Sequence, residues 1–552
     1  MKKMKRYTGL FLAAMLLLTA LTGCGETAKQ EEKFILSVCV CDQIELLDPA
    51  MNTNSDAQSI FYTLYENLMR YTDDGTGAAL LSSGMAKEYT EVSNYDGTVS
   101  YEFSLRSTAR WSDGEKVTAD DFVYAWQRLV DPATGSPNHA LLSMVRGYDK
   151  VRETGDVSAL AVSAKGDNTF CVTLSAPCAY FIDGVCTGVA TMPLRRDMVE
   201  KDRESWASTV NIVTNGAYRV GTWTKETSLQ TKRNEKYYES RLVGPDAVKF
   251  QFAPDAESAY ALYESGEADY ISRLPQRVLE QQSEEQNWTE TPIFATYCVL
   301  YNHLTDEFSD AHARKAFDLA IDRAAIAGAA GAETSPADGL VPVGVRDSED
   351  GADYRAVGGS LCAVDKETYC DRCAAALGEI TAAGNYRGAG FPSIEYLYST
   401  EDDIGSIVAL ELQEEWHECL NIDVQLRGVS QEEYDALIAA GDFTLAGQYL
   451  AVQQNDAMGF LESFSSGRED NALRYSNHTY DVLMGVAEKS ENITARTAFL
   501  HDAEAMLLED TALSPILFGA RSHMLREGLQ GIYYDGLGNT YFSNITQIPA
   551  GQ

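Results

Sequence analysis

Apolar residues recur along the chain with two different periods, and segments of the two kinds alternate. Tyr101, Phe103 and Leu105 occupy every second position, which predicts a strand with one buried face. A little further on, Phe122 and Trp126 lie four residues apart in a helical pattern, which predicts an amphipathic helix. The same alternation continues to the end of the sequence and predicts a mixed fold, α/β or α+β.

The pattern locates most of the remaining elements. Further strands are predicted at 34–40, as a pair in 168–181, as two strands after a turn at Asn215-Gly216, at 442–450 and at 514–525. Helices are predicted at 60–68, at 119–130 behind an N-cap at Thr118 with Asp121, at 253–266, at 309–328 with Ser309 as its N-cap, at 406–420 and at 494–510. Residues 330–375 carry no clear pattern and are predicted to be loops. A chain of 552 residues is too long for one core, so we expect two or three lobes.

The first 23 residues have the organisation of a secretory signal peptide. Four basic residues within positions 2–6 precede an apolar run at 9–21, which is short of the roughly 20 residues that span a bilayer. The run ends in Leu21-Thr22-Gly23-Cys24, which resembles the lipobox of bacterial lipoproteins. In that family the leader is cut before the cysteine, whose thiol then receives lipid. The resemblance implies a lipid anchor on Cys24; the alternative is an ordinary leader with an incidental cysteine.

Charge and composition restrict the partners of the exported chain. The net charge is −38, and loss of the basic leader makes it more negative. Such a surface repels nucleic acid and anionic lipid headgroups, so neither is expected as a ligand. The acidic residues are spread along the chain, which is typical of a solvated surface and not of one site.

The cysteines leave several possibilities open. The chain has eleven, and the pair in "CDRC" at 370–373 lies near Cys362 in the sequence. A structural zinc site needs four ligands, and neither a second CxxC nor a histidine cluster is present to complete one. A disulfide or free thiols are therefore preferred over a metal site or redox catalysis. No metal and no cofactor is predicted.

Motifs for catalysis are missing from the sequence. It contains no HExxH, no GxSxG and no GxxxxGK[ST], and no carboxylate pair stands out among its 82 acidic residues. We therefore predict that the protein is not an enzyme, with a surface hydrolase as the remote alternative.

Six segments, in this order, resemble one family of proteins. They are "LDP…YENL", "RWSDGEKVTADDFVYAWQRLVDPATGSP", "NIVTNGAYRVGTW" followed by "RNEKYY", "ESGEAD", "FSDAHARKAFDLAIDR" and "NTYFSN". The family is the large solute-binding proteins of ABC importers for oligopeptides and dipeptides. The resemblance runs from about Phe34 to about Ser543.

The resemblance implies a periplasmic-binding-protein-like type II fold with three lobes. Behind the signal peptide (1–23) and the lipidated tether (24–33), lobe I would comprise 34–70, 192–295 and 527–552. Lobe II would comprise 71–191 and lobe III 296–526. In the family, ligand lies in the cleft between lobes I and III, which close over it by hinge motion. Peptides bind there as an added strand.

The same resemblance implies which residues line the cleft. The loop after "LDP" places Thr53, Asn54 and Ser55 against ligand, and the strand "AGQYLAVQQND" faces them. The complete set of candidates is Thr53, Asn54, Ser55, Asn138, Ser272, Arg273, Gln431, Tyr434, Gly447, Tyr449, Leu450, Ala451, Gln453 and Asp456. For Tyr449 and Leu450 the alternative is core packing of a strand, and for Arg273 it is a plain surface charge.

Three positions depart from the family pattern. Oligopeptide binders carry an aspartate on the ligand strand that holds the α-ammonium of the peptide, and the aligned residue is Gln453. The family's tryptophan and arginine align with Leu450 and Gly447. A neutral amide can accept a hydrogen bond from an ammonium group but supplies no charge. Asp456 could replace that charge if the loop shifts.

These observations predict an extracytoplasmic, membrane-anchored solute-binding protein of an ABC importer. It would capture peptides, with oligopeptides preferred, as a monomer and deliver them to a permease encoded elsewhere. The tether would raise its effective concentration near that permease. The alternative is the same fold binding another solute, such as a metal chelate, a sugar or an opine.

Overall fold

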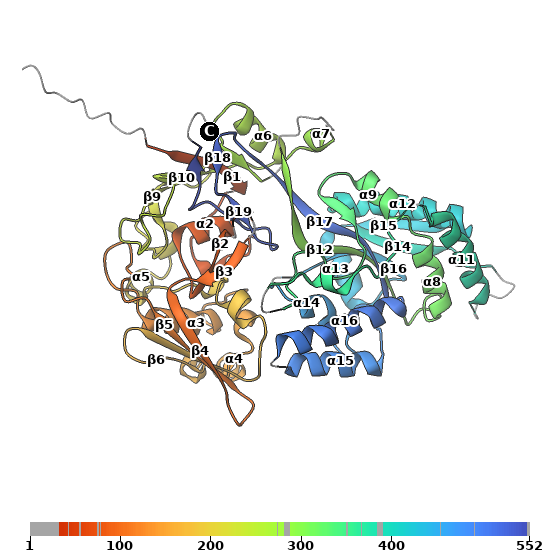
Figure 1. Ribbon diagram of the computed structural model, residues 1–552, viewed down its shortest axis with the longest axis horizontal. Coiled ribbons are helices and arrows are strands. Elements are labelled where there is room, and N and C mark those ends of the chain that lie inside the picture. The colour runs from red at the N-terminus through yellow and green to blue at the C-terminus, as the bar shows by residue number, and fades with distance from the viewer. Residues whose placement is uncertain are drawn as a thin grey trace, which may run out of the picture. The chain divides into compact units, whose positions relative to one another are not determined.

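The structure is a computed structural model (Figure 1). It describes residues 33–548 except 42, 55–56, 74, 76, 78, 273, 281–287, 349–350, 366, 384–389, 453 and 491. The chain divides into two compact units, Met1–Ile35 and Leu36–Gln552, and the second carries the fold. No helix in the described part of the chain has the length and apolarity to cross a membrane.

An 11-stranded sheet runs through the second unit. Its order is β15 (Val424–Val429), β14 (Ile394–Ser399), β16 (Leu445–Ala451), β12 (Thr289–Tyr301), β17 (Leu513–Leu525), β11 (Tyr270–Ile271), β1 (Ile35–Cys41), β10 (Ala247–Phe252), β9 (Ser228–Arg233) and β8 (Tyr218–Thr224), with β13 (Thr334–Pro336) also on β17. The order places the N-terminal strand β1 between β10 and β11, which come from the middle of the sequence.

Two long strands connect the two ends of this sheet (Figure 1). β12 and β17 pair with each other antiparallel, with register shifts between Pro292 and Thr296 and between Tyr297 and Cys298. β12 also pairs with β16, whereas β17 continues to β11, where Leu525 opposes Tyr270. These two strands therefore join β14, β15 and β16, at one end of the sheet, to β1 and β8–β11 at the other end.

A second sheet has four strands and forms from one sequence segment. Its order is β4 (Ala86–Ser93), β5 (Val99–Leu105), β7 (Thr169–Leu174) and β6 (Val162–Ala164). Helix α3 (Ala119–Val130) contacts β6 and β7, and its Trp126 meets Phe170 edge-on. The predicted Thr118–Asp121 capping box is present, and the Asp121 carboxylate also accepts a hydrogen bond from the Trp111 indole at 3.1 Å.

Helices and short strands complete the fold. The helices are α2 (Gln58–Leu64), α4 (Tyr148–Thr154), α5 (Arg196–Lys201), α6 (Ala256–Glu264), α7 (Gln276–Leu279), α8 (Ala311–Leu319), α9 (Arg323–Ala330), α10 (Tyr354–Gly358), α11 (Tyr369–Ala382), α12 (Asp403–Leu420), α13 (Gln431–Ala440), α14 (Met458–Leu461), α15 (His478–Lys489) and α16 (Ile493–Glu509). Three two-stranded sheets pair β2 (Met69–Asp73) with β3 (Ala79–Ser83), β18 (Leu529–Gln530) with β21 (Thr546–Gln547), and β19 (Tyr533–Tyr534) with β20 (Thr540–Tyr541).

Two helix predictions need correction. The helix expected at 309–328 is two helices, α8 and α9, because Asp322 interrupts the pattern and its carboxylate accepts a hydrogen bond from Ala325 N at 3.1 Å as the N-cap of α9. The N-cap of α8 is Asp310 and not Ser309. Residues 330–375 are not all loop, since α10 and the start of α11 lie there.

One strand prediction is confirmed and another needs correction. The two strands expected after Asn215-Gly216 form as β8 and β9, and their hairpin connection lies at 225–227. The Asn215 side chain bonds both backbone groups of Glu66, and Gly216 N donates to Leu64 O at 2.9 Å. In 168–181 only β7 forms, because its partner β6 precedes it and 181–185 is helical.

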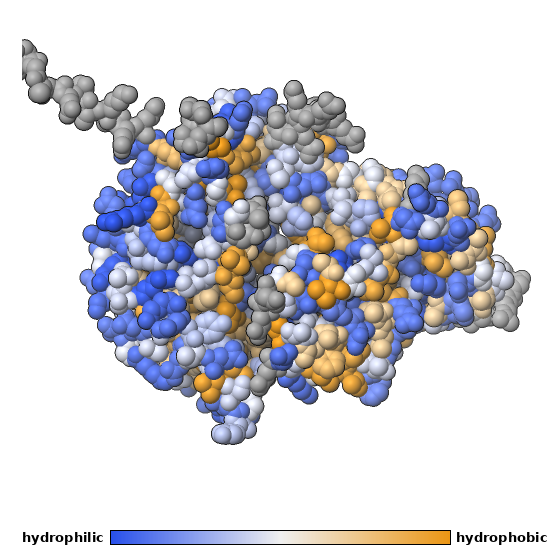
Figure 2. Space-filling model, viewed as in Figure 1, coloured by the Kyte–Doolittle hydropathy of each residue, from blue (hydrophilic) through white to orange (hydrophobic). Residues whose placement is uncertain are grey.

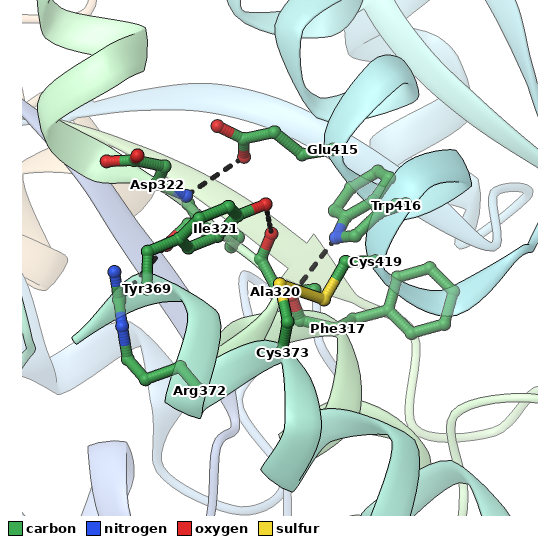
Figure 3. Close-up of a disulfide and its surroundings, with 10 residues drawn as sticks. All are labelled: Phe317, Ala320, Ile321, Asp322, Tyr369, Arg372, Cys373, Glu415, Trp416 and Cys419. Carbon is green, nitrogen blue, oxygen red and sulfur yellow. Dashed lines mark hydrogen bonds between the residues drawn. A yellow bond between two sulfur atoms is a disulfide. The ribbon is translucent and has the colours of Figure 1, made fainter. Parts of the chain in front are cut away.

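A disulfide joins α11 to α12 in Figure 3. Cys373 and Cys419 are bonded, with their Cα atoms 5.4 Å apart. Beside it, the Trp416 indole donates to Phe317 O at 3.0 Å, and Glu415 accepts from Asp322 N at 3.0 Å. Burial raises the pKa of Glu415 to about 8. Of the two cysteines in the CxxC motif, Cys373 therefore forms a disulfide with Cys419, and Cys370 remains an exposed thiol.

Candidate functional site

One edge of β16 stops pairing partway along the strand. On one side, β16 opposes β12 over its whole length, from Leu445 to Ala451. On the other side, parallel pairing with β14 covers only Leu445 and Ala446. Among the described residues no strand continues this second side. Such an edge can accept an added strand.

Backbone alternation identifies the residues that face this open edge. Thr444 O accepts a hydrogen bond from the β12 side at 3.1 Å, and Val452 N donates to that side at 3.2 Å. Because successive residues of a strand direct their N–H and C=O groups to opposite sides, Tyr449 and Ala451 present theirs to the open edge. We call these two residues the open edge of β16.

The side chain of Tyr434 holds β16 from its open side. The buried Tyr434 hydroxyl donates to Gly447 O at 2.8 Å. Beneath Gly447, the hydroxyls of Tyr297 and Tyr396 lie 3.3 Å apart and occupy the space that a side chain would need. The two tyrosines therefore fill the space in which a side chain at position 447 would lie.

The side chains of β16 divide between core and surface. Tyr449 is half-buried and meets Tyr297 edge-on, with ring centroids 5.0 Å apart. Leu450 is half-buried on the opposite face, against a second core cluster, whereas Ala451 is exposed. The side chains of Tyr449 and Leu450 thus make mostly core-packing contacts, which was the alternative interpretation for both. The backbone of Tyr449 remains available at the open edge.

Beyond β16, Asp456 is committed to a buried ion pair. Both of its carboxylate oxygens contact the Arg496 guanidinium, at 2.9 and 3.0 Å, and each side chain is 7% exposed. Oδ1 also accepts from Met458 N at 2.8 Å. Its charge is neutralised within the fold. Gln453 lies outside the described residues.

The loop after "LDP" is held from the segment that contains α3. Arg128 binds the buried Asp48 carboxylate with two hydrogen bonds of 2.6 and 3.0 Å. Asn138 donates to Ala50 O at 3.2 Å and to Asn52 O at 2.8 Å, so its amide positions the loop. The loop ends with two exposed candidates, Thr53 and Asn54, and the third, Ser55, lies outside the described residues.

The other candidates are scattered. Ser272 is buried, and its N–H donates to Cys39 O at 3.2 Å. Gln431 is exposed at the start of α13, with its amide 2.8 Å from Asp435. Arg273 lies outside the described residues, as does Cys24. Within the described part of the chain no hydrogen bond links the loop candidates to those around β16.

Sequence reasoning missed an ion pair near the end of β16. The Arg346 guanidinium lies 3.1 Å from the Asp183 carboxylate, and Arg346 N donates to Asn455 Oδ1 at 2.8 Å. Burial raises the pKa of Asp183 to about 6, although Arg346 opposes this shift. No sequence signal identified the pair, because Arg346 lies in the segment predicted to be loop.

Comparison with known proteins assigns the fold to a family. The family model described as "Bacterial extracellular solute-binding proteins, family 5 Middle" matches residues 81–472. The chain therefore belongs to this family, whose members are binding proteins and not enzymes. Within the described residues, no three His, Cys, Asp or Glu side chains are grouped so that they could hold a metal ion.

Three similar proteins illustrate the range of the family. The dipeptide-binding protein DppE of Bacillus subtilis is 27% identical over 96% of this chain and 97% of its own. The probable deoxycholate-binding periplasmic protein YgiS of Escherichia coli is 28% identical over 88% of each chain. A structure of the murein tripeptide-binding protein MppA, in an unliganded open form, superposes with a TM-score of 0.81 at 24% identity, covering 94% of this chain and 98% of that one. The MppA structure confirms the predicted mixed α/β fold class, while the division into three lobes at the stated boundaries stays a prediction.

Proposed function

We propose that this protein captures peptides outside the cytoplasm and delivers them to an ABC permease, held at the membrane by lipid on Cys24. The observation that carries the proposal is the open edge of β16. Tyr449 and Ala451 present backbone donors and acceptors that a peptide main chain can pair with, whatever its side chains are. The relatives named for dipeptides and tripeptides support the same ligand class.

The proposal includes a weak grip on the amino terminus of the peptide. Gln453 supplies no charge at the family's aspartate position, and the charge of Asp456 is neutralised by Arg496. A charge-assisted hydrogen bond contributes about 1.5–3 kcal/mol, against about 1 kcal/mol for a neutral one. An N-acetylated peptide should therefore bind about as tightly as its free-amine counterpart, and Gln453→Asp should introduce a preference for the free amine.

A non-peptide solute is the second candidate. It is favoured by the loss of two charges from the ligand strand, at Gly447 and Gln453, and by a relative named for deoxycholate. A steroid acid needs apolar surface and no strand edge.

One experiment separates these functions. The purified protein is incubated with a random tripeptide-to-pentapeptide library and, separately, with deoxycholate, and bound ligand is identified by mass spectrometry. Recovery of intact peptides supports the proposal. Recovery of deoxycholate without peptides would favour the second candidate, and recovery of cleaved peptides would contradict a binding function.

A further inference from the structure

The large sheet narrows to two strands between its two ends. Pairing of β12 with β16 covers 295–301, and β17 pairs with β13 at 517–519 and with β11 at 524–525. Between these stretches, 289–292 of β12 pair with 520–523 of β17, and within the described part of the chain no third strand pairs with either segment. We call these two segments the hinge segments. A change of angle between the two ends of the sheet concentrates there, because the fewest hydrogen bonds resist it.

The two ends of the sheet carry exposed apolar surface. Figure 2 shows apolar residues on the visible face over β3 and over α15. In Figure 1, β3 lies on the side of β8–β11 and α15 on the side of β14–β16. Leu80 of β3 is exposed, as are Val482 and Val486, which lie one turn apart in α15. A change of angle at the hinge segments therefore changes the separation of these apolar surfaces.

One residue, Glu333, bonds to both hinge segments. Its N–H donates to the Glu290 carboxylate of β12 at 2.7 Å. Its carbonyl oxygen accepts a hydrogen bond from Ala520 N, and its carboxylate accepts one from Ser522 N, both in β17 and both at 2.7 Å. Because alternate residues of a strand direct their N–H groups to the same side, Glu333 occupies the edge of β17 that β13 and β11 leave open.

The backbone of Glu333 has a conformation that few side chains adopt. Its φ is 67°, in the left-handed region, which disfavours residues with a Cβ atom. Such residues persist where the surrounding structure holds them, and they cluster at ligand clamps and switch regions. Here the surrounding structure is the Gly331 C-cap of α9 on one side and Thr334, the first residue of β13, on the other. Because α9 is anchored through Ile326 in the core at the β14 end of the sheet, Glu333 links that end to the hinge segments.

We infer that Glu333 is a positioning residue for ligand capture, which limits the range of angles that the hinge segments adopt. It holds β17 through two hydrogen bonds and β12 through one, and a twist of these strands past it strains all three. A narrower range of angles reduces the conformational entropy that is lost when the two ends of the sheet close on a peptide. The inference rests on the proposed function, because it requires a peptide held between these ends.

The test separates the carboxylate of Glu333 from its backbone. Glu333→Gly tolerates the left-handed backbone and removes the acceptor for Ser522 N–H, whereas Glu333→Gln keeps an acceptor without the charge. Spin labels are attached to p-acetylphenylalanine at Tyr95 and Val482, which are both exposed. Double electron–electron resonance then gives the distribution of distances between the four-stranded sheet and α15 without peptide. Glu333→Gly should broaden this distribution, and Glu333→Gln should match the parent.

The matched control is Asn421→Gly, because Asn421 also has a left-handed φ, 54°, but lies at the end of α12 outside the hinge segments. It should leave the distribution unchanged. In calorimetry with tetra-alanine, Glu333→Gly should bind about threefold more weakly than the parent, and Glu333→Gln should restore the parent affinity. Urea unfolding checks that each variant is folded.

A distribution of parental width in Glu333→Gly, or equal broadening in Asn421→Gly, would overturn the role of Glu333 and leave the proposed function standing. Failure of the parent to bind tetra-alanine would count against the proposed function, and the distance distributions would still decide the role of Glu333.

Discussion

Replacing Gly447 with alanine tests the packing that supports the ligand strand. A Cβ atom at this position would overlap the hydroxyl oxygens of Tyr297 and Tyr396 and lie 2.9 Å from Tyr297 Cζ. Both tyrosines are fully buried, so their rings have little freedom to move away. The hydroxyls would have to separate, and their 3.3 Å hydrogen bond would be lost.

The magnitude follows from three contributions. Overpacking a buried site costs about 1–3 kcal/mol, and the lost hydrogen bond costs about 1 kcal/mol more. Alanine recovers about 0.4–1 kcal/mol by restricting the unfolded chain. We therefore expect Gly447→Ala to reduce the free energy of unfolding by about 1–3.5 kcal/mol.

Urea unfolding followed by fluorescence and circular dichroism measures this loss. The matched control is Gly378→Ala, because a Cβ at this position in α11 meets nothing within 4 Å, and alanine should stabilise that helix by about 1 kcal/mol. Adding Tyr396→Phe to Gly447→Ala removes one overlapping oxygen and should restore part of the stability. If Gly447→Ala unfolds at the same urea concentration as the parent, the two tyrosines do not restrict the space at position 447 as described.

Three further predictions concern the anchor, the disulfide and pH. Cys24→Ala should move the protein from the membrane fraction to the medium or periplasm, and a variant that stays with the membrane would refute the lipid anchor. Because Cys373 and Cys419 close a loop with a sequence separation of 46, Cys373→Ser should cost about 4 kcal/mol of stability, whereas Cys370→Ser should cost almost none; equal urea midpoints would contradict the pairing. The raised pKa of Asp183, about 6 against 3.8 unfolded, means that the folded state holds its proton more tightly, so this group's contribution to stability falls as pH rises from about 4 to about 6. Asp183→Asn should remove that part of the pH dependence, and an identical stability profile for parent and variant would count against it.

Local signals in the sequence predicted local structure well. The Thr118–Asp121 capping box and the alternation in β5 were correctly located, because both depend on neighbours within a few residues. The break between α8 and α9 was missed, since Asp322 suits a solvated helix face as well as an N-cap.

The candidate site was only partly accessible from sequence. The resemblance identified β16, and the register then selected Tyr449 and Ala451, which no single-strand pattern could do because it requires the pairing with β12 and β14. Asp456 was proposed to replace a charge, but its partner Arg496 is forty residues away in the sequence and could be found only in the fold. Asp183 and Arg346 were missed for the same reason.

The central claim is that a peptide binds as a strand on the open edge of β16, and Ala451→Pro tests it most directly. Ala451 is exposed and its N–H faces the open edge, so proline removes a donor to the ligand without breaking a bond to β12. Leu450→Pro, whose N–H faces β12, is the contrasting variant and should destabilise the fold.

The measurement is the calorimetric affinity of Ala451→Pro for a peptide recovered from the library, beside its melting temperature. We predict an unchanged melting temperature with at least a fivefold loss of affinity, as expected when one hydrogen bond of about 1 kcal/mol is removed. An unchanged affinity in the folded variant would show that the peptide does not pair with this edge and would contradict the account.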